Sequence, residues 1–238
     1  MIDANPIILG IETATLAGSV SVARGDSVLA SRLGDARESH SNTLLRDISD
    51  VLSEAQIVLT DVEVFAAAVG PGSFTGLRIG LATTKALAAT MKRRCVAVPT
   101  LKAIAKAVGP LRNTVALLPA GRGEVFAQLF SLNDQGHLIE LDAPAHLPPQ
   151  KLLARYAGLQ EVVWAGPATE IHRNLIESYA LENSRGWTIA SFEPNLAKHV
   201  IALAVGSYRR GVTVPPESLQ ALYVRPLDAE LKANVVNR

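Results

Sequence analysis

The most constraining feature of the chain is the stretch from Gly70 to Lys85, which reads Gly-Pro-Gly-Ser-Phe-Thr-Gly-Leu-Arg-Ile-Gly-Leu-Ala-Thr-Thr-Lys. An apolar run over 64–69 precedes it, and a helical pattern continues over 77–89. The glycines of the loop permit backbone conformations that a side chain would forbid. This order of features predicts a buried strand, a tight glycine-rich loop and a helix that opens directly from the loop.

The start of this helix is a candidate binding site. Serine and threonine can cap a helix start, where unpaired N–H groups gather and the helix dipole favours an anion. We therefore expect the loop to contact either a phosphate group or a partner protein. The residues of this motif loop are Gly70, Pro71, Gly72, Ser73, Phe74, Thr75, Gly76 and Arg78, with Ser73 and Thr75 as the candidate caps.

Three well-known loop motifs do not match this stretch. A P-loop needs a lysine directly after its last glycine, and Gly76 is not followed by one. The dinucleotide fingerprint needs a glycine at its sixth position, which is Thr75 here. A nucleophile elbow needs glycines on both sides of the serine, whereas Ser73 is flanked at those places by Pro71 and Thr75. A plain tight turn between a strand and a helix remains the structural alternative.

A second candidate site follows the first apolar run, in the segment Gly-Ile-Glu-Thr-Ala-Thr. Its polar residues are Glu12, Thr13 and Thr15. An acid at the end of a buried strand, followed by hydroxyl groups in a turn, can meet a metal-bound water or a phosphate. The alternative is that the two threonines satisfy backbone groups of the turn while Glu12 faces solvent.

The histidines indicate no catalytic or metal site. Ser39-His40-Ser41 lies where a helix is expected to begin, so a capping serine is favoured over a His40 general base beside a nucleophile. The five histidines lack the His-x-x-x-His and His-Glu-x-x-His spacings. We expect no metal site formed by this chain alone.

Composition is typical of a globular cytoplasmic protein. The chain has 238 residues, a formal net charge of +1 and one cysteine, so it lacks an overall basic field and an internal disulfide. Its first six residues are not typical of a secretory signal, and no apolar run is long enough to span a bilayer. One basic cluster, Lys92-Arg93-Arg94, is expected just past a helix end, where cations complement the helix dipole.

Strands and helices are expected in two sets. The first set has strands at 7–11, 19–23, 28–33, 64–69 and 96–98 and helices at 39–55, 77–89 and 101–108. The second has strands at 115–118, 125–131, 137–141, 162–165 and 222–225 and helices at 148–156, 168–179 and 195–210. Because three strands precede the first helix, the order fits a duplicated α/β unit with a mixed sheet in each half rather than a dinucleotide fold.

Several segments together resemble the bacterial TsaB family, also called YeaZ. They are Ile8–Thr15, Ser39–Ser41 and Gly70–Gly80, with looser agreement at Gly123–Phe126, Ala165–Gly166 and Leu222–Arg225. The resemblance covers nearly the whole chain and is strongest before Pro99. It implies an α/β fold of two related actin-like ATPase (ASKHA, ribonuclease H-like) domains, which we assign to 1–100 with 195–212 and to 101–194 with 213–238. In this fold the first strands and the last long helix pack together.

The resemblance also implies a role in making N6-threonylcarbamoyladenosine in tRNA. Members of the family are non-catalytic partners of a paralogous transferase, TsaD, and a small ATPase, TsaE, joins their complex. We therefore expect a scaffold subunit that is not itself an enzyme, that meets tRNA only through the complex and that forms a homodimer when alone. The chain alone is expected to bind no cofactor, with ATP or ADP as candidate ligands of a site shared in the complex. Within that assembly the Lys92-Arg93-Arg94 cluster can touch a tRNA phosphate.

The family likeness places the partner-binding surface on the first two helices. Its expected members are Leu45, Ile48, Leu77, Leu81 and Lys85. Apolar residues lie almost all the way round the second helix, which requires burial on more than one side. Burial in the domain core alone is the alternative. A charged residue at Leu81 is expected to disrupt self-association or partner binding.

The chain departs from the family pattern at the start of the second domain. The family usually has Asp-Ala-Arg where this chain has Pro119, Ala120 and Gly121. The missing acid and base argue against nucleotide hydrolysis by the chain alone. The competing hypothesis is an autonomous small ATPase or phosphotransferase of the same fold that uses Glu12 and the Gly70 loop, and a peptidase built on His40 ranks last.

Overall fold

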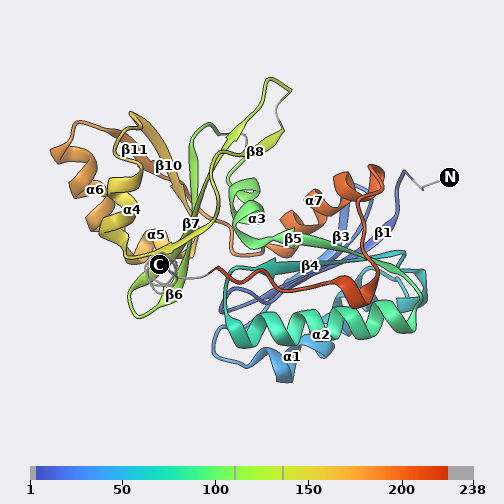
Figure 1. The fold of residues 1–238 in the computed structure, drawn as a ribbon. Helices are drawn as coiled ribbons and strands as arrows, with labels where there is room; N and C mark the ends of the chain where they lie inside the picture. Colours follow the sequence, from blue (N-terminus) through green and yellow to red (C-terminus); the bar gives the residue numbers. More distant parts are fainter. Residues whose placement is uncertain (1–3, 110, 136, 225–238) are drawn as a thin grey trace, which may run out of the picture. The chain divides into compact units, whose positions relative to one another are not determined.

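The computed structural model describes residues 4–109, 111–135 and 137–224, which divide into two compact units. Unit 1 comprises the chain up to Ala103 together with residues 194–222, and unit 2 comprises residues 104–193 with the end of the chain. Each unit is built on one mixed β-sheet with helices packed beside it (Figure 1). The expected α/β class with a mixed sheet in each half is therefore confirmed.

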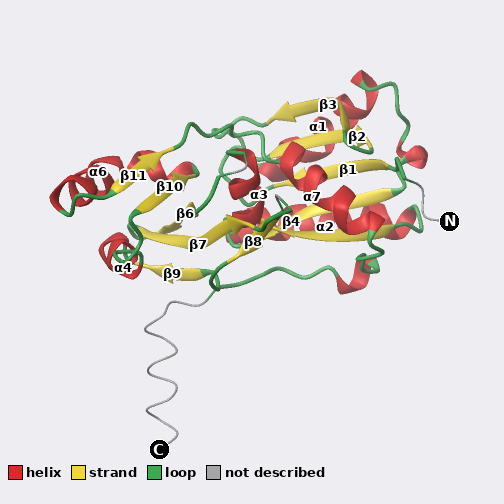
Figure 2. Cartoon of the chain, turned by 90° about the horizontal axis from the view of Figure 1, so that it is seen from above, coloured by secondary structure: helices red, strands yellow, loops and turns green. Residues whose placement is uncertain are grey.

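The sheet of unit 1 has the strand order β3-β2-β1-β4-β5 (Figure 2). Its first three strands form an antiparallel meander, and β4 and β5 run parallel to β1. The strands are β1 (Ile7–Glu12), β2 (Ser19–Arg24), β3 (Ser27–Leu33), β4 (Val64–Gly70) and β5 (Arg94–Pro99). All five were expected from the sequence, with ends that differ by at most two residues.

Helices cover both faces of this sheet, with α1 and α2 on one face and α7 on the other (Figure 1). The helices of the unit are α1 (His40–Glu54), α2 (Phe74–Thr90), α3 (Thr100–Ala107), in which the division between the units falls, and α7 (Ala197–Arg209). Short 3-10 turns lie at η1 (Leu59–Asp61) and η2 (Pro216–Ser218). A side chain at Gly10 would place its Cβ 2.6 Å from Ile201, so this glycine lets α7 lie close against β1. The expected packing of the first strands against the last long helix is confirmed.

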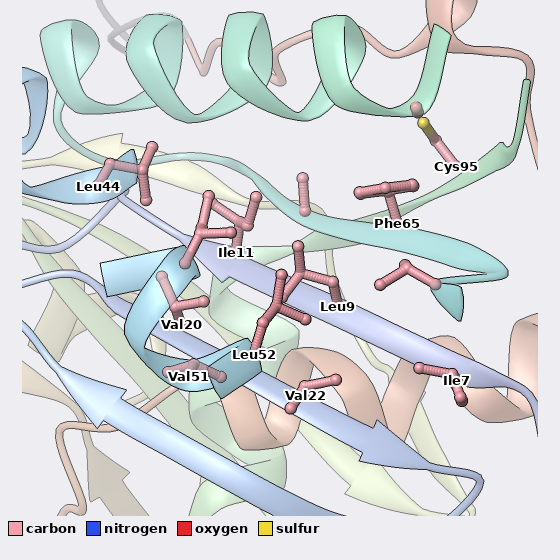
Figure 3. Close-up of a cluster of buried hydrophobic side chains, with 14 of the residues drawn as sticks. Ile7, Leu9, Ile11, Val20, Val22, Leu44, Val51, Leu52, Phe65 and Cys95 are labelled. Carbon is pink, nitrogen blue, oxygen red and sulfur yellow. The ribbon is translucent and has the colours of Figure 1, made fainter. Parts of the chain in front are cut away.

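Because both faces are covered, β1 is buried along its whole length. Alternate β1 side chains point toward α1 and α2 and meet the apolar face of α1 (Figure 3). This cluster includes Ile7, Leu9 and Ile11 from β1, Val20 and Val22 from β2, Leu44, Val51 and Leu52 from α1, and Phe65 and Cys95 from β4 and β5. Full burial of each large aliphatic side chain contributes about 1.5–3 kcal/mol. The core therefore fixes the first-strand region on which the candidate site is built.

The segment that follows α7 runs back along the sheet of unit 1, although the sequence assigned residues 213–222 to the second domain. Val214 pairs with Cys95 on β5, Leu219 is fully buried, and the N–H of Leu222 donates to the carbonyl of Val69 at 2.7 Å. Residues 222–224 form no strand, so the strand expected at 222–225 is wrong for these three residues. Its last residue, Arg225, lies outside the described residues. We call residues 211–222 the return segment.

The sheet of unit 2 has the order β11-β10-β6-β7-β8, with β9 also paired to β7. Its directions repeat those of unit 1, because β6, β7 and β8 are antiparallel and β10 and β11 run parallel to β6. The strands are β6 (Thr114–Gly121), β7 (Glu124–Leu132), β8 (Leu138–Glu140), β9 (Ala145–Leu147), β10 (Glu161–Ala165) and β11 (Gly186–Ile189). The sequence did not predict β9 or β11, which have only three and four residues.

The helices of unit 2 are α4 (Pro149–Arg155), α5 (Pro167–Ile171) and α6 (Arg173–Glu182). The single helix expected over 168–179 is interrupted at His172, whose φ of −110° and ψ of 15° are not helical. Among the residues that the structure describes, no helix has both the length and the apolar character that crossing a bilayer would require.

Candidate functional site at the Gly70 loop

The two candidate motifs of the sequence lie next to each other. β1 and β4 are parallel neighbours in the sheet, so their carboxyl ends meet at the same edge. The turn that contains Thr13 and Thr15 follows β1, and the Gly70 loop follows β4. The arrangement brings the first-strand turn into contact with the start of α2.

Hydrogen bonds join these segments directly. The N–H of Ser73 donates to the carbonyl of Ala14 at 2.8 Å. The hydroxyl of Thr13 donates to the carbonyl of Gly76 at 2.8 Å, in a buried position. The Ser73 N–H, which would face an anion in a phosphate-binding loop, is therefore bonded to the chain's own first-strand turn.

Three glycines explain how the segments come so close. A Cβ at Gly72 would lie 2.5 Å from the carbonyl oxygen of Ala14, and one at Gly76 would lie 2.0 Å from that of Thr13. A Cβ at Gly80 would lie 2.1 Å from the Thr13 hydroxyl oxygen. Gly76 and Gly80 are four residues apart and so face one side of α2 near its start, and Gly72 precedes them in the loop. The sequence carried this spacing, but the role of Gly80 was not inferred from it.

The rest of the loop shapes the start of α2. Ser73 is the N-cap, as expected, and its hydroxyl oxygen accepts the N–H of Gly76 at 3.2 Å, whereas Thr75 lies inside the first turn and is exposed. Pro71 is buried after a cis peptide bond, and the N–H of Gly70 donates to the hydroxyl of Thr100 at 3.1 Å. The first turn of α2 therefore has a fixed position in unit 1.

An aromatic and a basic side chain stand out from this fixed turn. The side chain of Phe74 is 53% exposed, and the guanidinium carbon of Arg78 lies 3.8 Å from the centre of its ring. Such a cation–π pair contributes about 0.5–1 kcal/mol at an exposed site. The two residues form a preordered, partly apolar projection that solvent reaches.

Glu12 is fully buried at the centre of the first-strand turn, so the expectation that it faces solvent is wrong. Its carboxylate accepts the N–H and the hydroxyl of Thr15, each at 2.7 Å. Burial raises the pKa of Glu12 above its ordinary value, against the opposing effect of these hydrogen bonds. Thr15 satisfies the turn, as the structural alternative proposed, since its hydroxyl also accepts the N–H of Gly18.

A second chain of hydrogen bonds links Glu12 to α7. The hydroxyl of Ser19 lies 3.4 Å from the Glu12 carboxylate, to which it donates, and accepts the N–H of Ala197 at 3.0 Å. Because Ala197 is the first residue of α7, the turn after β1 and the start of α7 share one buried polar network. No sequence pattern indicated this role of Ser19, because the contact joins residues far apart in the chain.

His40 belongs to the same region without forming a catalytic arrangement. Ser39 caps α1, as expected, and the Nε2 atom of His40 lies 3.1 Å from the carbonyl oxygen of Thr15. A pocket of about 10 Å³ lies beside it, lined in part by Glu12, Thr43 and Asp47, with room for about one water molecule. This pocket cannot accept a nucleotide phosphate.

Three of the five residues expected on the partner surface are buried inside unit 1 itself. Ile48, Leu77 and Leu81 are 4%, 1% and 7% exposed, so their side chains have almost no surface for a partner to touch. Leu45 is 66% exposed, and Lys85 is partly exposed. For the three buried residues, the alternative of burial in the domain core describes the fold better.

The segment that departs from the family pattern, Pro119 to Gly121, forms the end of β6, directly before the turn to β7. Gly121, Arg122 and Gly123 all have positive φ, and Arg122 is exposed. An arginine is therefore present one position later than the resemblance would place it. After the turn, Glu124 lies 2.8 Å from His146 Nε2 on β9.

The described residues contain no group of three or more His, Cys, Asp or Glu side chains arranged to hold a metal ion. The expectation about metals stays a prediction for the chain as a whole.

Comparisons with known proteins agree on one family. A family model described as TsaD, tRNA N6-adenosine threonylcarbamoyltransferase, matches residues 34–226. The chain is 29% identical to the tRNA threonylcarbamoyladenosine biosynthesis protein TsaB of Escherichia coli, over 92% of this chain and 94% of that protein. It is 26% identical to the Bacillus subtilis protein of the same name, over 71% and 75% of the two chains.

A solved structure described as YeaZ from Pseudomonas aeruginosa superimposes with a TM-score of 0.77 at 26% identity, covering 92% of this chain and all of that one. This similarity supports the actin-like α/β fold that the resemblance implied.

Proposed function

Because the chain belongs to the tRNA N6-adenosine threonylcarbamoyltransferase family, and within it to the TsaB (YeaZ) group, we propose that it is a non-catalytic subunit of the complex that makes threonylcarbamoyladenosine in tRNA. Its partner is the paralogous transferase of the TsaD type, with a TsaE-type ATPase as a further member. The chain organises the transferase and does not itself transfer the threonylcarbamoyl group.

One observation carries the proposal: the Gly70 loop binds the chain's own first-strand turn. Ser73 and Gly76 both use backbone groups to contact Ala14 and Thr13, and the glycine spacing fits that contact. A loop evolved to cradle a phosphate would keep its N–H groups directed at the ligand. A loop locked against a neighbouring turn supports a different role, which is to hold the exposed start of α2 in one position for a partner.

The repeated strand order of the two sheets supports the idea that both units descend from one actin-like unit. In that case the chain and its transferase partner share an architecture, and a shared nucleotide site would draw residues from both. The described residues around Glu12 leave room for no more than a water molecule, so we assign no nucleotide step to this chain alone.

The proposal is tested by threonylcarbamoyl transfer to tRNA. The purified chain and the transferase paralogue from the same organism are assayed separately and together, with threonylcarbamoyl-AMP as donor. We expect no transfer by the chain alone and clear stimulation of the paralogue. Transfer by the isolated chain, or an unchanged rate for the paralogue, would refute the proposal.

The autonomous ATPase hypothesis makes the opposite prediction for the isolated chain. Titration calorimetry with Mg-ATP would then give tight binding and measurable hydrolysis. Under our proposal the isolated chain gives neither, because Thr13, Ser73 and Gly76 are engaged with one another.

A further inference from the structure

A basic cluster, Lys92-Arg93-Arg94, follows the C-terminal end of α2. Lys92 is exposed and Arg93 is half-buried in the turn between α2 and β5, and Arg94 is exposed at the first position of β5. The turn is held by N–H groups of Lys92 and Arg93, which donate to the carbonyls of Ala89 and Ala88 at 3.1 and 2.8 Å. The three cations are therefore presented by a fixed backbone.

Neutral oxygens, rather than carboxylates, hold the two guanidinium groups. Arg93 donates to the carbonyl of Thr60 at 3.4 Å. Arg94 donates to the hydroxyl and the carbonyl of Thr213, at 3.1 and 2.8 Å. These bonds order both side chains without pairing either guanidinium with a carboxylate.

Six other arginines among the described residues are paired with acids instead. Within residues 4–109, 111–135 and 137–224, no carboxylate lies within 4.0 Å of the side-chain nitrogens of Lys92, Arg93 or Arg94. The arginines that do pair with acids are Arg32, Arg37, Arg46, Arg155, Arg173 and Arg209. The nearby Asp61 directs its carboxylate to the N–H of Val58 instead.

We infer that Lys92, Arg93 and Arg94 form a binding patch for the sugar–phosphate backbone of tRNA, an inference that rests on the proposed function. A guanidinium has five N–H donors, and Arg94 uses two of them on Thr213, so donors remain for a phosphate. Side chains that are already ordered lose less entropy on binding. Exposed cations without acidic partners are the groups that release counterions when they meet nucleic acid.

The patch is separate from the surface proposed to meet the transferase. α2 has 17 residues, so its two ends lie about 25 Å apart at 1.5 Å per residue. The Gly70 loop, Phe74 and Arg78 lie at one end, and the basic patch follows the other. The subunit would thus hold the enzyme at one end of α2 and the RNA at the other.

The test measures tRNA binding by the complex of this chain with its transferase paralogue, at several salt concentrations. Lys92→Ala removes a charge without removing any of the hydrogen bonds described above, and Lys92→Ala/Arg94→Ala removes two charges. We expect the dissociation constant for tRNA to rise about two- to fivefold per charge, and the slope of log K against log salt to fall by about one unit per contact.

Two control variants separate charge from structure. Arg173→Ala removes an exposed arginine that is paired with Glu170 and Glu177, and we expect wild-type tRNA affinity from it. Thr213→Val removes the hydroxyl that orders Arg94 but keeps every charge, so its salt slope should match the wild type.

Wild-type affinity and salt slope in folded Lys92→Ala and Lys92→Ala/Arg94→Ala complexes would overturn the inference. Loss of the transferase from these complexes would also overturn it, since the patch would then bind protein. Transfer activity of the wild-type complex reports separately on the proposed function, because the inference depends only on the difference in tRNA affinity between wild type and variants.

Discussion

At the scale of single residues, Glu12 places a carboxyl group in the interior of unit 1. The side chain is fully buried, and its partners are hydrogen-bond donors from Thr15 and Ser19. These donors favour the ionised form, yet burial outweighs them and raises the pKa. The carboxyl group that holds the turn after β1 together therefore loses its proton less readily in the folded chain than in the unfolded chain.

The raised pKa of Glu12 predicts a particular dependence of stability on pH. The unfolded chain releases this proton near the ordinary pKa of 4.5, whereas the folded chain retains it to higher pH. The Glu12 contribution to the free energy of unfolding is therefore full below pH 4.5 and falls as pH rises through the raised pKa. The slope approaches about 1.4 kcal/mol per pH unit between the two values.

Urea unfolding of the wild type and of Glu12→Gln from pH 4 to 8 checks this prediction. Glutamine has similar size and no titration, so the stability difference between the two proteins should change with pH only inside that window. Parallel profiles over the whole range would contradict the raised pKa.

Of the glycines at the site, Gly76 lies closest to a neighbouring backbone atom. An alanine there would bring its Cβ to 2.0 Å from the carbonyl oxygen of Thr13, so α2 or the first-strand turn must move. We expect Gly76→Ala to lower the free energy of unfolding by about 2–4 kcal/mol. The matched control is Gly158→Ala, where no atom lies within 4 Å of the added Cβ and the expected change is about 0.5 kcal/mol or less. Denaturant unfolding of both variants measures the difference, and equal stabilities would show that the loop can relax.

At the scale of elements, the sequence predicted those features that depend on neighbouring residues. The five strands of unit 1, the caps at Ser39 and Ser73 and the strand–loop–helix at Gly70 were all expected, because periodicity and capping are local. The interruption at His172 was not, since the apolar pattern continues across it. Strands as short as β9 carry too few residues to show a period and exist through their pairing with β7.

At the candidate site, too, the sequence predicted which residues matter but not the contacts between residues that are distant in the chain. The sequence identified Glu12, Thr13 and the Gly70 loop as important but left their contacts open, because residues 13 and 76 meet only through the parallel pairing of β1 and β4. It also placed Leu81 on the partner surface. An apolar helix face can pack against either a partner or the chain's own core, and here the core takes Leu81. A Leu81→Glu change would bury a charge and destabilise unit 1, so it cannot test partner binding.

At the scale of the whole molecule, the proposed function depends on an exposed surface that another protein can reach, and Phe74 offers a direct test of it. Its ring is 53% exposed and is stacked with Arg78 on a turn that hydrogen bonds hold in place. Aromatic and arginine side chains dominate the binding energy of many interfaces, and a preordered pair loses little entropy on binding. We expect Phe74→Ala to weaken binding to the transferase paralogue at least about tenfold, with little change in stability.

Binding of Phe74→Ala is measured by titration calorimetry, with unfolding curves recorded for the same protein. Leu181→Ala is the control, because Leu181 is 84% exposed but lies on α6 in unit 2, outside the helices that the family resemblance assigns to the partner. If Phe74→Ala binds as tightly as the wild type while Leu181→Ala binds less tightly, the partner surface lies on unit 2 instead. Phe74→Ala leaves every hydrogen bond between the Gly70 loop and the first-strand turn in place. If only Phe74→Ala binds the paralogue less tightly, the Phe74 side chain itself contacts the partner, and the role of the loop is to hold that side chain in position.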